Sequence, residues 1–296
     1  MSFDYCKMAT ENIEGYTDYN IGKEWYKNRK PGLSAVIRCC GEERWIGPCI
    51  ESSLPLFDEI VVTLTEVEGD RTEDIVNSFH SPKITLIKYP FKISNQKKKF
   101  VECDSVHQFS YYTNWSLSKT TRSHVSARWD ADHILRSEFA TKSFRDFILS
   151  KEKVRVRSFN VVTPDFKYLS KEMPYQSYHV RFERVNPYLY FTGNSDATTY
   201  LGWPQLFLVK RWLYFPVQQA QVVYFRLTCK DVSIKDPVFF HTKFLKFHEN
   251  QFDIDDRFLS KRNVNYVDDW TSFGKKIDVK IPDCVFKKPE DYLSEK

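Results

Sequence analysis

Residues 33–67 read LSAVIRCCGEERWIGPCIESSLPLFDEIVVTLTEV, and this stretch decides the fold class. Short apolar runs without a helical period, 33–40 and 58–67, stand at its two ends, and such runs are typical of strands buried on both faces. Between them, residues 41–57 repeat apolar side chains at helical spacing, so we expect a helix there despite the early Pro48. The stretch therefore predicts a strand, a helix and a second strand.

The same alternation continues along the chain. The pattern predicts a helix over 70–79, a strand over 83–91, a helix over 109–122 and a strand over 123–129. Alternating strands and helices indicate a parallel sheet with right-handed crossovers. Because ligands of such sheets lie beyond the carboxyl ends of the strands, we expect a nucleotide in the loops that follow the first two strands.

The second half of the chain is less regular. We expect a helix over 137–149, with Ser137 as its N-cap. Strands follow at 154–163, 177–185 and 188–193, several of them with period-two alternation, and 235–245 is a last apolar stretch that carries His241. This pattern predicts a mixed or antiparallel half attached to the parallel one.

Composition limits the classes of function. The 296 residues fit one large domain or two small ones, and the 42% hydrophobic and 28% charged content is ordinary for a globular protein. A net charge of +5 is too small to indicate a dedicated nucleic-acid binder, so we expect no nucleic-acid partner.

Cysteines and apolar runs bear on location. The seven cysteines are odd in number, and none forms a C-x-x-C pair, which excludes a recognisable zinc site or disulfide framework. No stretch reaches the roughly eighteen apolar residues of a membrane span, and the amino terminus lacks a signal-peptide pattern. We therefore expect a cytoplasmic protein whose membrane contact, if any, is peripheral.

The most informative short motif is Asp130-Ala131-Asp132, which ends the strand predicted over 123–129. Such triplets also arise by chance, and Asp253-Ile254-Asp255 lies in a polar stretch where we interpret it as solvated. At the ligand edge of a sheet, however, two acids repel each other unless a cation lies between them. The motif thus indicates Mn²⁺ or Mg²⁺, with an N-cap or surface pair as the alternative.

Three segments in this order resemble the GT-A fold glycosyltransferases, family 2 in particular. They are LSAVIRCCGEERWIGPCIESSLPLFDEIVV (33–62), GDRTEDIV (69–76) and NWSLSKTTRSHVSARWDADHIL (114–135). The resemblance implies an α/β fold with a Rossmann-like mixed sheet, a parallel amino-terminal half, helices on both faces, and a single domain with an acceptor-side subregion. The implied segments are a lead-in (1–31), a nucleotide-sugar-binding half (32–136), an acceptor-binding and catalytic half (137–250) and a C-terminal extension (251–296).

The activity implied by the resemblance is transfer of a sugar from a nucleotide sugar to a hydroxyl, with inversion at the anomeric carbon. The donor would carry UDP by default, and the acceptor would be a glycan, glycolipid or glycoprotein. In this family a histidine far downstream often completes the metal site. His241, in the apolar run PVFFHTKF, fits that position beside Asp130 and Asp132, although a lone histidine there is more often a core residue.

Nucleotide contacts are expected from the ends of the first strands and from the helix–strand segment before the triplet. The candidates are Arg38, Cys40, Glu42, Thr65, Arg122 and Asp130. The family usually has an aspartate pair where this chain has Thr65 and Glu66, so GDP or another nucleotide remains an alternative to UDP. Arginine can add a bidentate phosphate contact, and surface ion pairing is the alternative for both arginines.

The acceptor hydroxyl requires a general base, typically a carboxylate. Asp196 is the candidate, with helix capping as its alternative and Asp231 and Asp236 as reserves. Trp203 and Trp212 can stack on sugar faces or pack in the core.

Two other functions compete with sugar transfer. A sugar nucleotidyltransferase usually has a glycine-rich phosphate loop after the first strand, whereas CCGEERW has one glycine and two acids. A non-catalytic glycan- or nucleotide-binding module on the same scaffold stays open.

Overall fold

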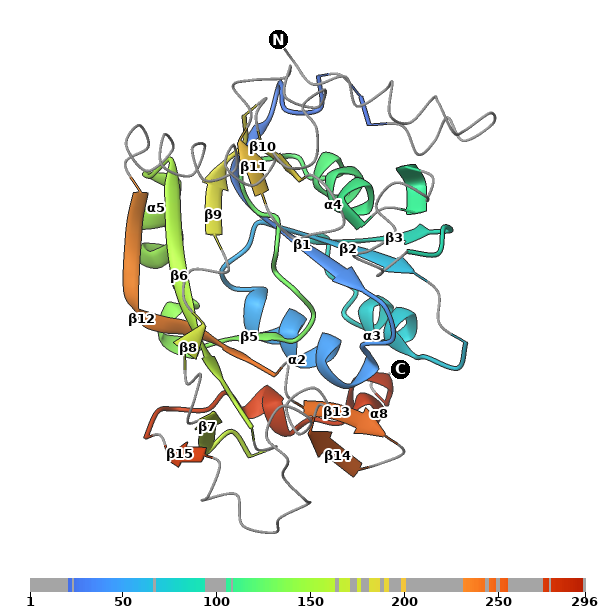
Figure 1. The fold of residues 1–296 in the computed structure, drawn as a ribbon, viewed down its shortest axis with the longest axis vertical. Coiled ribbons are helices and arrows are strands. Elements are labelled where there is room, and N and C mark those ends of the chain that lie inside the picture. Colours follow the sequence, from blue (N-terminus) through green and yellow to red (C-terminus); the bar gives the residue numbers. More distant parts are fainter. Residues whose placement is uncertain are drawn as a thin grey trace, which may run out of the picture.

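A computed structural model describes the following parts of the chain: 21–22, 24–65, 68–93, 105–107, 109–162, 165–170, 175–176, 181–186, 189–191, 198–200, 231–242, 245–248, 251–254, 274–276 and 278–294. Within them, helices pack on a central nine-stranded sheet (Figure 1). This arrangement confirms the predicted α/β class with a mixed sheet.

The amino-terminal half alternates strands and helices as predicted. Its elements are β1 (Lys30–Cys39), α2 (Glu43–Ser53), β2 (Glu59–Thr65), α3 (Thr72–Ser78), β3 (Ile84–Tyr89), η2 (Ser105–His107), α4 (Phe109–Ser118) and β4 (Arg122–Ser126). β1 pairs in parallel with both β2 and β4, and β2 pairs in parallel with β3. The predicted parallel half is therefore confirmed.

The rest of the sheet comes from later segments. These are β5 (His133–Leu135), β6 (Lys153–Asn160), β8 (Tyr175–Gln176), β9 (Arg181–Arg184) and β12 (Asp231–His241). The strand order is β3-β2-β1-β4-β9-β6-β12-β5, and β8 pairs with β6. Because β9 is antiparallel to both β4 and β6, β6 runs in the direction of β1, and β12 runs parallel to β6. The carboxyl ends of β1, β2, β4, β6 and β12 thus share one edge.

Smaller elements surround this sheet. The helical ones are η3 (Ser137–Phe139), α5 (Lys142–Leu149), η6 (Asp283–Phe286) and α8 (Pro289–Leu293). The strands form three pairs: β7 (Tyr168–Ser170) with β15 (Gly274–Lys276), β10 (Leu189–Phe191) with β11 (Thr198–Tyr200), and β13 (Leu245–His248) with β14 (Gln251–Ile254).

Both faces of the sheet carry buried apolar residues. In β1, Leu33, Ala35 and Ile37 join the large core that α2 and α3 cover, whereas Val36 joins Leu117 of α4 on the other face. Successive strand residues point to opposite faces. Because both faces are buried here, the run does not alternate apolar and polar residues. The prediction of helices on both faces is confirmed.

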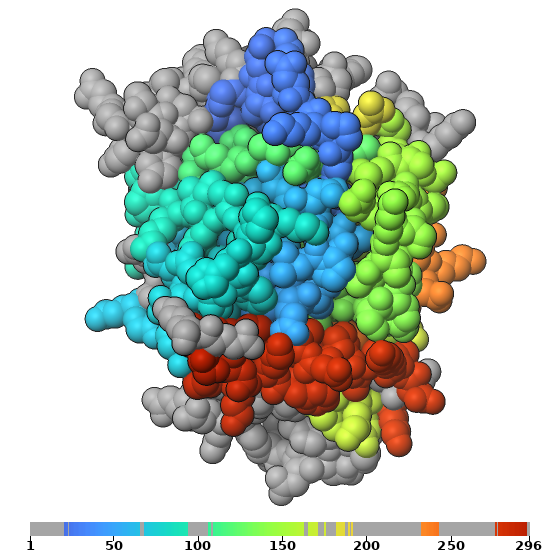
Figure 2. All heavy atoms as spheres, turned by 180° about the vertical axis from the view of Figure 1, so that it is seen from behind, coloured from blue at the N-terminus to red at the C-terminus, as the bar shows by residue number. Residues whose placement is uncertain are grey.

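The end of the described chain packs along α2 (Figure 2, red). The guanidinium of Arg44 donates to the carbonyls of Val285 and Lys287 at 3.1 and 2.8 Å. The ring of Tyr292 lies where Gly47 has no Cβ, so any larger residue at that position would clash with the ring. These contacts attach η6 and α8 to the amino-terminal half.

The predicted start of the helix over 137–149 is wrong. Ser137 was expected to cap the helix over 137–149, but it opens the short η3 turn, and α5 begins only at Lys142. The N-cap is Thr141, whose hydroxyl accepts a hydrogen bond from the Phe144 N–H at 3.2 Å. A threonine with an extended backbone can accept a hydrogen bond from a free N–H of the first turn, so Thr141 is the N-cap of α5.

No helix in the described part of the chain is long and apolar enough to cross a membrane.

Candidate active site

Asp132 and His241 meet at the carboxyl edge of the sheet. Asp132 lies in the turn between β4 and β5, and His241 is the last residue of β12. β12 runs antiparallel to β5, with His241 opposite His133. The pairing brings two residues that are far apart in the sequence to one point: His241 Nε2 lies 3.1 Å from Asp132 Oδ2.

Backbone bonds hold the Asp130–Asp132 turn in place. The Trp129 N–H donates to the Val36 carbonyl of β1 at 3.2 Å. The Thr242 N–H, just after β12, donates to the Asp132 carbonyl at 3.1 Å. The turn is therefore fixed to strands on both sides, and Asp132 projects from a rigid support.

The charge state of Asp132 depends on its histidine neighbours. Burial alone would raise the pKa of Asp132, but the charge and hydrogen bond of His241, with the charge of His133, outweigh burial. The pKa of Asp132 consequently lies below its usual value, so this partly buried carboxyl is ionised.

The Asp132–His241 pair fits a divalent metal. One ligand atom each from Asp132, His133 and His241 lies within 4.8 Å of the others. Two ligands about 2.1 Å from one octahedral ion, at right angles to each other, lie about 3.0 Å apart. The 3.1 Å between His241 Nε2 and Asp132 Oδ2 matches that spacing.

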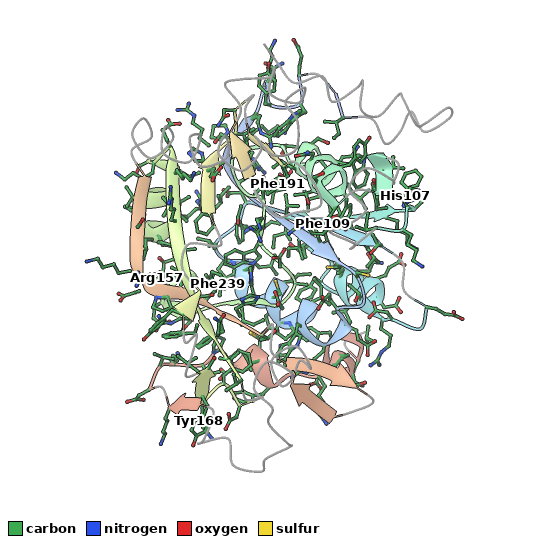
Figure 3. The ribbon with its side chains drawn as sticks, in the orientation of Figure 1. His107, Phe109, Arg157, Tyr168, Phe191 and Phe239 are labelled. Carbon is green, nitrogen blue, oxygen red and sulfur yellow. The ribbon has the colours of Figure 1, made fainter. Side chains whose placement is uncertain are left out.

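Asp130 has different partners from Asp132. Its Oδ1 accepts a 2.6 Å bond from Arg38 Nη2, and Arg38 Nη1 donates to Thr113 of α4 at 2.8 Å. The guanidinium, whose side chain is only 5% exposed, also lies 4.7 Å from the ring centroid of Phe109 (Figure 3). Asp130 is therefore held by the Arg38 guanidinium, which is itself fixed by Thr113 of α4.

Glu42 adds a third carboxyl to this edge. Burial raises the pKa of Glu42 to about 8, and the charges of Asp132 and Asp130 add to the rise. The Glu42 N–H donates to the Thr72 hydroxyl at 3.1 Å, which fixes the loop after β1. Carboxyl groups gathered this closely favour binding of a cation.

Comparison with known proteins identifies the chain. Residues 5–281 match the family described as beta-1,4-N-acetylgalactosaminyltransferase (CgtA). The chain belongs to this CgtA family. The resemblance to glycosyltransferases predicted from three short segments is thereby confirmed over most of the sequence.

Other comparisons are less informative. Among solved structures, S. aureus TarS (residues 1–349) aligns with a TM-score of 0.43 and 13% identity. The alignment covers 71% of this chain and 60% of the TarS chain. No curated protein sequence matches the chain.

The structure of this CgtA-family chain places two further nucleotide-contact candidates at the same edge. Thr65 ends β2, and its hydroxyl donates to the Cys39 carbonyl at 3.2 Å. Cys40 follows β1 and is exposed. Both lie where parallel strands present ligands.

Three predicted residues are not brought to this edge. Arg122 begins β4 and lies opposite Lys30, at the other end of the sheet. Asp231 begins β12, about 33 Å of strand from His241, and Asp236 is about 16 Å from it. Strand length therefore separates each from the carboxyl cluster.

The predicted base and stacking residues, Asp196, Trp203 and Trp212, lie outside the described residues. His133 is the residue at this edge that the sequence reasoning missed. It directly follows Asp132, and its place beside that aspartate is the one feature of the sequence that could have indicated it.

Proposed function

We propose that this CgtA-family chain transfers N-acetylgalactosamine from its UDP-activated form to a hydroxyl of a glycan, glycolipid or glycoprotein, with inversion at the anomeric carbon. The sugar follows from the description of the family, and UDP and inversion follow from the resemblance of the N-terminal segments. The observation that carries the proposal is the 3.1 Å approach of His241 to Asp132 at the carboxyl edge of the sheet.

Asp132 and His241 would hold Mn²⁺ or Mg²⁺ through Oδ2 and Nε2. When bound, the ion neutralises the charge that develops on the departing diphosphate. The chain contributes the ligand atoms in place, because β12 and the turn after β4 are joined by backbone bonds. Asp130 stays part of the predicted metal set, but its bond to Arg38 favours a contact with the nucleotide.

The nucleotide would lie across the ends of β1, β2 and β4. Arg38, fixed by Asp130 and Thr113, supplies positive charge near the phosphates. Cys40, Glu42 and Thr65 border the same region. In this proposal residues 32–136 bind the donor, residues 137–250 bind the acceptor, and residues 1–31 and 251–296 flank them.

The acceptor hydroxyl would lose its proton to Asp196 as it attacks the anomeric carbon. Inversion requires this base on the face opposite the departing diphosphate. The proposal places the reaction in the cytoplasm, where the cysteine pattern predicts that thiols stay reduced.

A donor panel tests the proposal. The pure protein is incubated with UDP-, GDP-, CMP- or dTDP-sugars, with and without Mn²⁺, and release of the free nucleotide is measured with glycan acceptors. We expect turnover with UDP-N-acetylgalactosamine and metal, and NMR of the product gives the anomeric outcome. Turnover with a different donor would correct the sugar or base.

Two outcomes would point to the competing functions. Formation of a nucleotide sugar from a nucleoside triphosphate and a sugar phosphate would show a nucleotidyltransferase. Glycan or nucleotide binding that survives Asp132→Asn, without turnover of any donor, would show a binding module.

A further inference from the structure

His133 lies inside the candidate site but is completely shielded from solvent. Its ring centroid is 4.4 Å from that of Phe239, 5.8 Å from that of Trp129 and 4.8 Å from that of His241. A fully packed imidazole has a fixed ring orientation, so each of its nitrogens has a defined neighbour.

The first nitrogen, Nδ1, accepts a hydrogen bond. Its donor is the Asp130 backbone N–H at 3.1 Å, and a backbone N–H can only donate. Nδ1 therefore carries a lone pair. In a neutral imidazole the other nitrogen then carries the proton, so His133 presents Nε2–H.

The second nitrogen faces Asp132. His133 Nε2 lies 3.7 Å from Asp132 Oδ1, whereas His241 Nε2 lies 3.1 Å from Oδ2. Two imidazoles thus approach the two oxygens of one carboxylate. At 3.7 Å the His133 contact is too long for a hydrogen bond and is electrostatic. The N–H dipole attracts Oδ1 toward His133, so Oδ2 points toward His241.

We infer that His133 is a positioning residue that orients Asp132 through Nε2–H, and that it is not a third metal ligand beside Asp132 and His241. The inference rests on the metal site of the proposed function. It assigns opposite tasks to the two histidines beside one carboxylate. With metal bound, His241, 3.1 Å from Oδ2, would offer a lone pair to the ion, and His133, 3.7 Å from Oδ1, would offer a proton to the carboxylate.

The alternative, ligation by His133 Nε2, conflicts with the Asp130 contact. A neutral imidazole that binds metal through Nε2 carries its proton on Nδ1, where it would face the donating N–H of Asp130. Two donors opposite each other in a buried place would leave both without an acceptor. Outer-shell partners of metal ligands typically contribute 10- to 100-fold to metal affinity, which sets the expected effect.

Pulsed EPR of bound Mn²⁺, in the presence of UDP, tests this assignment, because it detects the nitrogen of each coordinated imidazole. We expect one coordinated imidazole in the wild type and none in His241→Asn. His133→Asn keeps an acceptor near the Asp130 N–H but loses Nε2–H, so the imidazole signal should persist while Mn²⁺ affinity falls roughly 10-fold or more. His133→Gln, which offers an amide N–H toward Asp132, should recover part of that loss.

The outcomes distinguish the positioning role of His133 from the metal site of the proposed function. Two coordinated imidazoles in the wild type, or unchanged Mn²⁺ affinity in both folded His133 variants, would overturn the positioning role alone. A wild-type protein that binds no Mn²⁺ with UDP would overturn the metal site of the proposed function and this inference with it. Thermal unfolding of each variant identifies loss of folding, and His133→Gln serves where His133→Asn does not fold.

Discussion

Carboxylates stand at both ends of the parallel strands, but their partners differ. At the amino end, Asp58 accepts the Leu33 N–H at 2.9 Å and pairs with Arg145 at 2.7 Å. Glu59 next to it accepts both the N–H and the hydroxyl of Thr121, at 2.8 and 2.7 Å. Each carboxylate at this edge is matched by donors of the protein, and its role is to hold strands together.

At the carboxyl end the carboxyl groups lie close to one another. Besides burial, the charges of Asp132 and Asp130 raise the pKa of Glu42, whereas His241 and His133 lower the pKa of Asp132. The comparison shows that a carboxylate count does not identify a site. What distinguishes the carboxyl edge is the 3.1 Å approach of His241 Nε2 to Asp132 Oδ2, a spacing that fits two ligands of one metal ion.

Removing one carboxylate charge from each edge tests the difference between the two edges with the largest expected effect. Asp132→Asn should lower transfer about 1000-fold, since the metal that would balance the charge on the departing diphosphate is no longer held. Asp58→Asn should keep activity but destabilise the fold by about 1–3 kcal/mol, because a charged pair is lost. Activity and calorimetric unfolding of both variants check this, and the reverse pattern would contradict it.

The histidines offer a second, matched pair. His241→Asn should raise the Mn²⁺ concentration needed for half-maximal activity by at least roughly 100-fold. His124, also buried but bonded to the Lys151 carbonyl at 3.1 Å, lies in β4 away from the carboxyl cluster. His124→Asn should leave the metal requirement as it is. Equal metal requirements in the two variants would remove His241 from the site.

Arg38 provides a third test, because its guanidinium lies 2.6 Å from Asp130 at the carboxyl edge. Arg38→Lys keeps the charge but cannot bond Asp130 and Thr113 together or stack on Phe109. We expect kcat/KM for the donor to fall about tenfold, the equivalent of one charge-assisted hydrogen bond, with the metal requirement unchanged. A shifted metal requirement would mean that Arg38 acts on the metal ligands instead.

The smallest effect concerns pH. The pKa of Glu42 is about 8 in the folded chain against an ordinary 4.5. Between those values only the unfolded state loses the proton, so stability falls as pH rises from about 4.5 to 8. Glu42→Gln should flatten this fall and raise the melting temperature at pH 8 by a few degrees. An unchanged slope of melting temperature against pH would contradict the clustering of carboxyl groups.

Local patterns predicted the sheet well, because apolar runs such as that around Val36 report burial directly. They could not predict the approach of His241 to Asp132, which depends on the antiparallel pairing of β12 with the short β5. The resemblance to a family supplied that pair instead. Arg122 shows the opposite failure: it is near Asp130 in sequence, yet most of β4 separates them. His133 carries no sequence signal beyond its place beside Asp132.

Calorimetric titration of Mn²⁺ into the protein with UDP tests the central claim most directly, namely that the carboxyl edge is a metal site and the amino edge is not. We expect one saturable site in the wild type and in Asp58→Asn, and its loss in Asp132→Asn. Binding that persists in a folded Asp132→Asn variant, or a wild-type protein without any Mn²⁺ site, would contradict it.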